Sequence, residues 1–285
     1  MNTAMAAVNA DTINSILSQR EDSFSVVFRE IPKSSGPRDA YVLMTSTRSA
    51  SPIVYADDVK TMTPSQIADY MEEVYKNAQL EFDGEKVMDA SYILQHVMPH
   101  IAGEDKGDYL RKSGYSTVPF HNMIVTFAIE MEGGFFLLTD KLMQDLGIRY
   151  EQIIEAALEH REHDYTIRKI SDMLCDLGYG PANDEDGLPL FVVTSRTSEG
   201  NYGASVILSH RILHETAVRI GVSRLALIPS SIHEFLAYPA TLMGETNAMR
   251  NMIRDINETV VAPEDVLNDT LYIWDDEKQE LSEVE

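Results

Sequence analysis

One short segment of the sequence, residues 229–234, holds hydroxyl, imidazole and carboxylate groups directly after an apolar run. A serine hydroxyl becomes a nucleophile when a histidine accepts its proton and a further polar group orients that histidine. The segment supplies these residue types as Ser230, Ser231, His233 and Glu234. It therefore allows a hydrolase-type site, although catalytic partners normally come from separate elements of a fold. The alternative is structural, because Ser231 and Glu234 also have the spacing of a capping box at a helix start.

Two histidines, His210 and His214, stand four residues apart on a predicted helix, so both imidazoles can face one metal ion. The same spacing occurs in zinc-protease helices, but Arg211 takes the place of their catalytic glutamate. Polar residues on an ordinary helix also explain the pair, so His210 and His214 are kept as candidate metal ligands. The sequence indicates no cofactor, because it contains neither the Gly-x-Gly-x-x-Gly loop nor the Gly-Lys-Ser/Thr loop that binds nucleotide phosphates.

The strands expected around these residues form antiparallel pairs. Runs rich in Phe, Val and other apolar residues at 23–31 and 40–44 flank the turn signal Ser-Ser-Gly-Pro, which predicts a hairpin. The runs at 122–130 and 135–139 flank a Gly-Gly pair, which predicts a second hairpin. Further short strands are expected at 53–55, 188–194, 204–208, 224–228 and 270–274.

Helices are expected between the strands, and several of their ends carry clear signals. The segment 63–66, Thr-Pro-Ser-Gln, combines a capping box with proline at the first helical position, so a helix begins there. Gly147 terminates a short helix over 140–146. A helix over 166–177 would bury Cys175, the only cysteine, as a small apolar residue. The other expected helices cover 11–19, 151–160, 211–220 and the residues around 249–256.

These elements predict an α+β fold, in which antiparallel hairpins and a mixed sheet are interleaved with helices and two subdomains can form. The Gly-rich, acidic segment 178–187 predicts a loop or linker between them. The predicted division is an N-terminal α+β region over 1–180 and a C-terminal α+β region over 188–274. The last residues, 275–285, form an acidic tail that we expect to be frayed and solvated.

The charge balance limits the partners of this chain. It has 285 residues, with 46 acidic and 23 basic side chains and a formal net charge of −23. Such a chain is repelled by nucleic-acid phosphates and by anionic membranes, so we expect neither as a direct partner. Hydrophobic residues make up 44% of the chain, which is enough for a packed core. No secretory signal and no membrane span is evident, so a cytoplasmic location is expected.

Several phrases of the sequence are familiar when they occur together. They are Gly-Ala-Ser-Val-Ile-Leu at 203–208, Ile-Pro-Ser-Ser-Ile-His-Glu at 228–234, Asn-Asp-Thr-Leu-Tyr at 268–272, and the hairpin and helices of 118–161. Together they resemble a bacterial family of unknown function, common in Gram-positive gut bacteria and in genomes rich in mobile elements. The resemblance implies a bacterial, cytoplasmic setting, and it implies no catalytic residue.

The leading functional hypothesis is a non-enzymatic intracellular protein for interaction or regulation, with an acidic surface and a basic protein as its partner. A specific form of it is a mobile-element accessory whose acidic face blocks a nucleic-acid-binding host protein. The alternative is a hydrolase-type enzyme that uses the Ser-Ser-Ile-His-Glu segment at 230–234. The sequence leaves open whether the chain is an enzyme, and it leaves the oligomeric state open as well.

Overall fold

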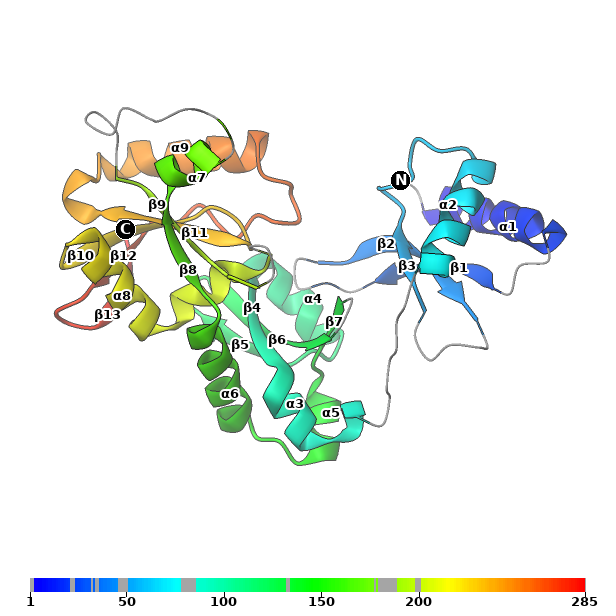
Figure 1. Cartoon of the computed structure of the whole chain (residues 1–285), viewed down its shortest axis with the longest axis horizontal. Helices are drawn as coiled ribbons and strands as arrows, with labels where there is room; N and C mark the ends of the chain where they lie inside the picture. Colours follow the sequence, from blue (N-terminus) through cyan, green and yellow to red (C-terminus); the bar gives the residue numbers. More distant parts are fainter. Residues whose placement is uncertain are drawn as a thin grey trace.

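The structure, a computed structural model, describes residues 3–20, 24–31, 33, 36–45, 51–77, 86–131, 134–176, 178, 189–197 and 201–284. Residues 34–35 of the first predicted turn, Gly133 of the second, and the predicted linker apart from Gly178 lie outside these residues. Antiparallel sheets alternate with helices along the chain, which confirms the α+β prediction. Figure 1 shows two parts: an N-terminal unit (residues 3–77, blue to cyan) and a larger body (residues 86–284, cyan-green to red).

The N-terminal unit packs an antiparallel sheet against two helices and has its own core. Its elements are α1 (Thr3–Gln19), β1 (Ser25–Ile31), β2 (Arg38–Met44), β3 (Ile53–Tyr55) and α2 (Pro64–Asn77). The pairing of β1 with β2 confirms the first predicted hairpin. The capping box before α2 is also confirmed, because the Thr63 N–H donates to Gln66 Oε1 at 2.9 Å. The core gathers apolar side chains from this unit, such as Ile13, Tyr41 and Met71.

The first half of the body is built on a sheet with the order β4-β6-β5, in which β7 also pairs with β6. The elements are η1 (Lys86–Met88), α3 (Ala90–His96), β4 (Val97–Gly103), η2 (Glu104–Lys106), α4 (Gly107–Lys112), β5 (Thr117–Phe120), β6 (Met123–Met131), β7 (Gly134–Leu137), α5 (Asp140–Leu146) and α6 (Tyr150–His163). The pairing of β6 with β7 confirms the second predicted hairpin. Gly147 ends α5 as predicted, in the left-handed conformation at φ 66° that glycine adopts without strain.

The second half of the body is built on a longer sheet with the order β13-β12-β10-β11-β9-β8. The elements are β8 (Thr166–Lys169), α7 (Ile170–Asp176), β9 (Phe191–Thr194), η3 (Gly203–Leu208), α8 (His210–Ile220), β10 (Arg224–Pro229), β11 (Glu234–Pro239), η4 (Ala240–Leu242), α9 (Thr246–Thr259), β12 (Tyr272–Asp275) and β13 (Glu280–Glu283). Helix α9 covers one face of this sheet and α8 lies on the other side (Figure 1). The two halves of the body share one core, which contains Ile101 and Phe127 from the first sheet and Leu225 and Trp274 from the second.

Several local predictions differ from the structure. The run 166–177 is not one helix, because Thr166–Lys169 pairs with β9 as strand β8 before the short helix α7 begins. Cys175 lies on α7, where no described residue is buried, and is exposed and not buried. The run 204–208 forms the 3-10 helix η3 and not a strand. The tail that was expected to be frayed contains β13, whose residues pair with β12 in the edge of the sheet.

The predicted boundary at residues 178–187 falls between two strands of one sheet. β8 precedes this segment, β9 follows it, and the two pair antiparallel. The described packing instead divides the chain between α2 and η1. The hydrophobic core of the N-terminal unit is formed by residues up to the end of α2, and the shared core of the body is formed by residues from η1 onward.

Candidate functional site

The segment 230–233 forms the turn between β10 and β11, and its hydroxyls serve that turn. Ser231 Oγ accepts a hydrogen bond from the backbone N–H of His233 at 3.0 Å, and Ser230 Oγ donates to Glu234 Oε1 at 3.0 Å. The capping-box interpretation of this segment is wrong, because Glu234 begins strand β11 and no helix starts here. A serine that bonds to a backbone N–H two residues ahead is typical of a tight turn.

The ring of His233 is held on both sides by other parts of the body. Its Nδ1 accepts from the backbone N–H of Tyr202 at 3.2 Å, and its Nε2 faces Asp265 Oδ2 at 3.4 Å. When the ring is neutral its proton therefore lies on Nε2, toward the carboxylate. The four predicted catalytic residues thus lie on one turn, but the contacts of the described residues pair neither serine hydroxyl with the imidazole.

Tyr202 lies at the centre of a cluster of rings. Its backbone is left-handed at φ 53°, and its ring stacks on His100 of β4 with centroids 4.3 Å apart and planes within 2°. The ring of Phe135 meets both at its edge. His100 is fully buried, and neither ring nitrogen has a hydrogen-bond partner within the part of the chain that the structure describes. Burial, together with the positive charges of Arg161 and Lys33, lowers the pKa of His100 to about 3, so this imidazole stays neutral.

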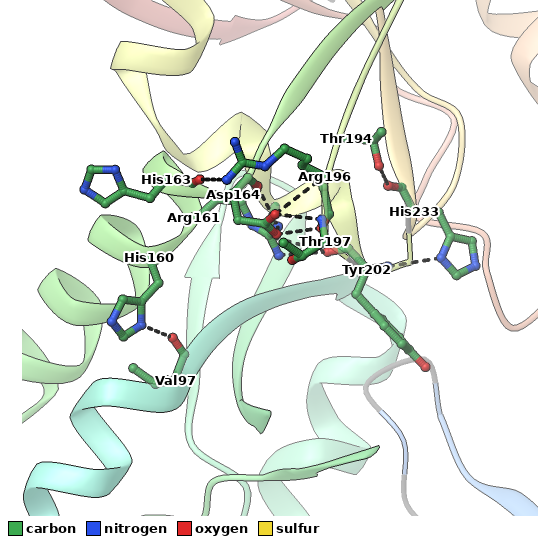
Figure 2. A network of polar contacts seen from close by, with 12 residues as sticks. Val97, His160, Arg161, His163, Asp164, Thr194, Arg196, Thr197, Tyr202 and His233 are labelled. Atoms are coloured by element: carbon green, nitrogen blue, oxygen red, sulfur yellow. Dashed lines mark hydrogen bonds and ion pairs between the residues drawn. The ribbon is translucent and has the colours of Figure 1, made fainter. Parts of the chain in front are cut away.

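A polar network around Asp164 includes the backbone of Tyr202 (Figure 2). The guanidinium of Arg161, which is 1% exposed, donates to Asp164 Oδ2 at 3.0 Å and to the Tyr202 carbonyl at 3.3 Å. Ser195 Oγ donates to Asp164 Oδ2 at 2.6 Å, and the Thr197 N–H donates to Oδ1 at 2.8 Å. Burial disfavours the charged carboxylate, but the hydrogen bonds from Ser195 and Thr197 and the charge of Arg161 outweigh it and lower the pKa of Asp164.

Sequence reasoning missed this network, although one signal was available. The buried face of α6 contains Ile153, Ala157 and Arg161, at intervals of four residues. An arginine on an apolar helical stripe has to find a buried anion or carbonyl oxygens, because an unpaired buried charge is strongly destabilising. Figure 2 shows the end of α6 fastened further, by His160, whose Nδ1 lies 2.7 Å from the Val97 carbonyl, and by Arg196, which donates to the His163 carbonyl.

The N-terminal unit reaches the ring cluster through Lys33, which lies between β1 and β2. Lys33 Nζ lies 5.0 Å from the centroid of the Phe135 ring and 5.1 Å from that of Tyr55. The guanidinium carbon of Arg38 lies 4.1 Å from the Tyr55 centroid. In Figure 2 the hydroxyl of Tyr202 projects toward the blue ribbon of this unit. The ring cluster therefore forms the junction of the two parts of the molecule.

In the comparison with known families, the family of unknown function named DUF5688 matches residues 8–276. The chain belongs to this family. Membership confirms that the chain comes from a family whose function is unknown, and it assigns no activity to the turn at 230–233 or to the network around Asp164. No curated protein and no solved structure matches the chain.

The two candidate metal ligands of this DUF5688 member have separate neighbours. The ring of His210 lies 4.9 Å from that of Trp274, and His214 Nδ1 lies 2.9 Å from Asp276 Oδ1. The described residues contain no group of three or more His, Cys, Asp or Glu side chains that could hold a metal ion. Metal binding by His210 and His214 stays a prediction without a third ligand in that part of the chain.

The outer face of α6 carries an acidic stripe, which we define as Glu151, Glu155 and Glu159. All three side chains are exposed, and they are opposite the buried face that contains Ile153 and Ala157. Glu151 lies 3.8 Å from Arg149 in an exposed ion pair, whereas Glu155 and Glu159 have no ion pair with any residue that the structure describes.

Among the described helices, none is long and apolar enough to cross a membrane.

Proposed function

We propose that this chain is a non-enzymatic interaction or regulatory protein that binds a basic protein partner through an acidic surface. The acidic stripe on α6 carries the proposal. Like charges four residues apart on a helix repel and destabilise it by roughly 0.2–0.5 kcal/mol per pair. A partner that places cations beside these three carboxylates would relieve their mutual repulsion.

The way in which α6 is held supports a binding role. Its inner face packs in the core through Ile153 and Ala157, and Arg161 ties its last turn to Asp164. The carboxylates of the acidic stripe therefore keep a fixed spacing. When a partner binds, only the rotamers of these side chains have to be ordered. Pre-organisation of this kind raises affinity, because less conformational freedom is lost on binding.

The hydrolase alternative gains no support from the geometry. In the predicted site His233 is the base for a serine hydroxyl, but both of its ring nitrogens face other partners, Tyr202 and Asp265. We therefore propose no enzymatic activity for Ser230 and Ser231. The proposal keeps the setting that the family resemblance implied, a bacterial cytoplasm, and the mobile-element accessory as its specific form.

The test is a pull-down with the tagged protein from a lysate of the bacterium that encodes it, at low and at high salt. The variant Glu151→Gln/Glu155→Gln/Glu159→Gln removes the acidic stripe. A matched control, Glu73→Gln/Asp255→Asn/Glu258→Gln, removes the same charge from exposed positions on α2 and α9. We expect one basic protein to be enriched by the wild type and by the control at low salt, and to be lost from the stripe variant and at high salt. Equal loss from both variants, or capture that high salt leaves unchanged, would contradict the proposal.

A further inference from the structure

A cavity of about 220 Å³ lies beside α6, on the side of the body where β5 forms the edge of its sheet. Every residue that lines it is apolar, and the lining includes Pro99, Val118, Phe120, Ile154, Leu158 and Leu208. The six named side chains, apart from that of Pro99, are half-buried, so they form a recess that opens to the surface. A dry apolar cavity of roughly 150 Å³ binds benzene in other proteins, so this volume accommodates one aromatic or branched aliphatic side chain.

Helix geometry places the acidic stripe next to this cavity. On an α-helix, residues three and four apart are neighbours on the surface. Glu151 is therefore beside Ile154, and Glu155 is beside Leu158, and both apolar residues line the cavity. Glu162 follows Leu158 by four residues, but its carboxylate is already engaged by Ser209 at 2.6 Å and by Arg211 at 3.3 Å. Glu151, whose ion pair with Arg149 is exposed, and Glu155, which has no ion pair with any described residue, thus lie along the side of the recess.

We infer that the cavity receives one large apolar side chain from a partner segment whose neighbouring residues are lysine or arginine. The inference rests on the proposed function, since it names the chemistry of the partner that meets the same helix. The apolar walls select the anchor, and the acidic stripe selects the flanking cations. An acidic or uncharged segment lacks the second set of contacts. Interfaces in which a central apolar anchor fills a pocket and charges surround it are common in protein recognition.

The experiment uses three fluorescein-labelled synthetic peptides and the full-length protein, with binding followed by fluorescence anisotropy. The first peptide is a run of lysines with one central phenylalanine, the second has alanine in place of the phenylalanine, and the third has glutamine in place of the lysines. The protein variants are Val118→Trp, which fills the cavity from its rim, and the stripe variant Glu151→Gln/Glu155→Gln/Glu159→Gln. Thermal melting of each variant establishes that it is folded.

We expect the wild type to bind the phenylalanine peptide about 10- to 100-fold more tightly than the alanine peptide, the range that burial of one large apolar side chain provides. Val118→Trp should remove this preference and retain the salt-dependent binding of both lysine peptides. The stripe variant should bind both lysine peptides more weakly.

The outcomes separate the two proposals. Equal binding of the phenylalanine and alanine peptides to the wild type would overturn the cavity inference alone and leave the acidic surface standing. If the phenylalanine peptide with lysines binds no better than the peptide with glutamine in place of the lysines, both proposals are overturned. If Val118→Trp does not fold, the methyl resonances of Ile154 and Leu158 decide. They should shift with the phenylalanine peptide and not with the alanine peptide, and unchanged resonances would overturn the inference.

Discussion

The N-terminal unit and the body use the same kind of layers, helices against antiparallel sheets, but their interiors differ. Within the residues that the structure describes, the core of the N-terminal unit is apolar, and every buried polar or charged side chain lies in the body. The body buries a guanidinium and a carboxylate, at Arg161 and Asp164, and an imidazole, at His100, that has no hydrogen-bond partner among the described residues. An apolar core tolerates small rearrangements, whereas a buried charge requires its partner at one position. The difference predicts that replacing a buried polar side chain of the body lowers the free energy of unfolding more than replacing an exposed one.

The largest effect is expected from Asp164→Ala. It leaves the guanidinium of Arg161 buried without its counter-ion, and loss of one partner of a buried pair costs about 3–5 kcal/mol. Urea unfolding followed by the fluorescence of Trp274, the only tryptophan and a buried residue of the body, measures the loss. The control is Asp176→Ala, which removes the exposed partner of Arg168 and should cost no more than about 0.5 kcal/mol. Similar urea midpoints for the two variants would show that the network does not hold the body together.

A smaller but still substantial effect is expected from Gly203→Ala. A Cβ atom at this position would collide with the backbone nitrogen of Ser195 and with Thr194 Oγ1, and would lie 2.7 Å from the His233 carbonyl oxygen. Overpacking of this kind lowers the free energy of unfolding by about 1–3 kcal/mol. Urea unfolding followed by Trp274 fluorescence measures this loss. Gly134→Ala is the control, because a Cβ there meets nothing within 4 Å. A neutral Gly203→Ala would mean that Gly203 can move away from Ser195 and from the turn at 230–233.

Acid should weaken the body through His100. The folded-state pKa of about 3 lies below the unfolded value of about 6.5, so the unfolded chain binds a proton in this window and the folded chain does not. Stability therefore falls as the pH falls from about 6.5 toward 3, with a slope that approaches roughly 1.4 kcal/mol per pH unit from this group. His100→Phe keeps a ring between Tyr202 and Phe135 and removes the titrating group, so its stability should change less with pH over that window. An unchanged slope would show that His100 is solvated in the native state.

The smallest effect is expected at the junction. The ammonium group of Lys33 lies over the Phe135 ring at 5.0 Å, and such a contact contributes about 0.5–1 kcal/mol at partly exposed sites. A double-mutant cycle of Lys33→Ala with Phe135→Leu isolates this term, with urea unfolding followed by circular dichroism, which reports both parts. Lys76→Ala on α2 serves as a control, because its partner Glu72 belongs to the same unit. A coupling energy of zero would show that the contact of Lys33 with Phe135 does not stabilise the junction.

The sequence predicted elements best where the signals are local. The hairpin of β1 and β2, the capping box at Thr63 and the glycine that ends α5 each depend on residues a few positions apart. The predictions that were wrong concern segments whose conformation depends on a distant partner. Apolar residues at helical spacing follow Thr166–Lys169, and this spacing predicted one helix over 166–177. Thr166–Lys169 forms a strand because β9 pairs with it. The acidic tail is ordered in the same way, because β12 offers it an edge.

The candidate site divides along the same line. The sequence by itself determined the residue types at 230–234, the net charge of −23, the spacing of the acidic stripe and membership of the DUF5688 family. Only the tertiary structure decided that His233 faces Tyr202 and Asp265, and that Asp164 binds Ser195, 31 residues further along the chain. Periodicity and capping are properties of neighbouring residues, whereas the partner of a buried polar group is chosen by the packing of separate elements.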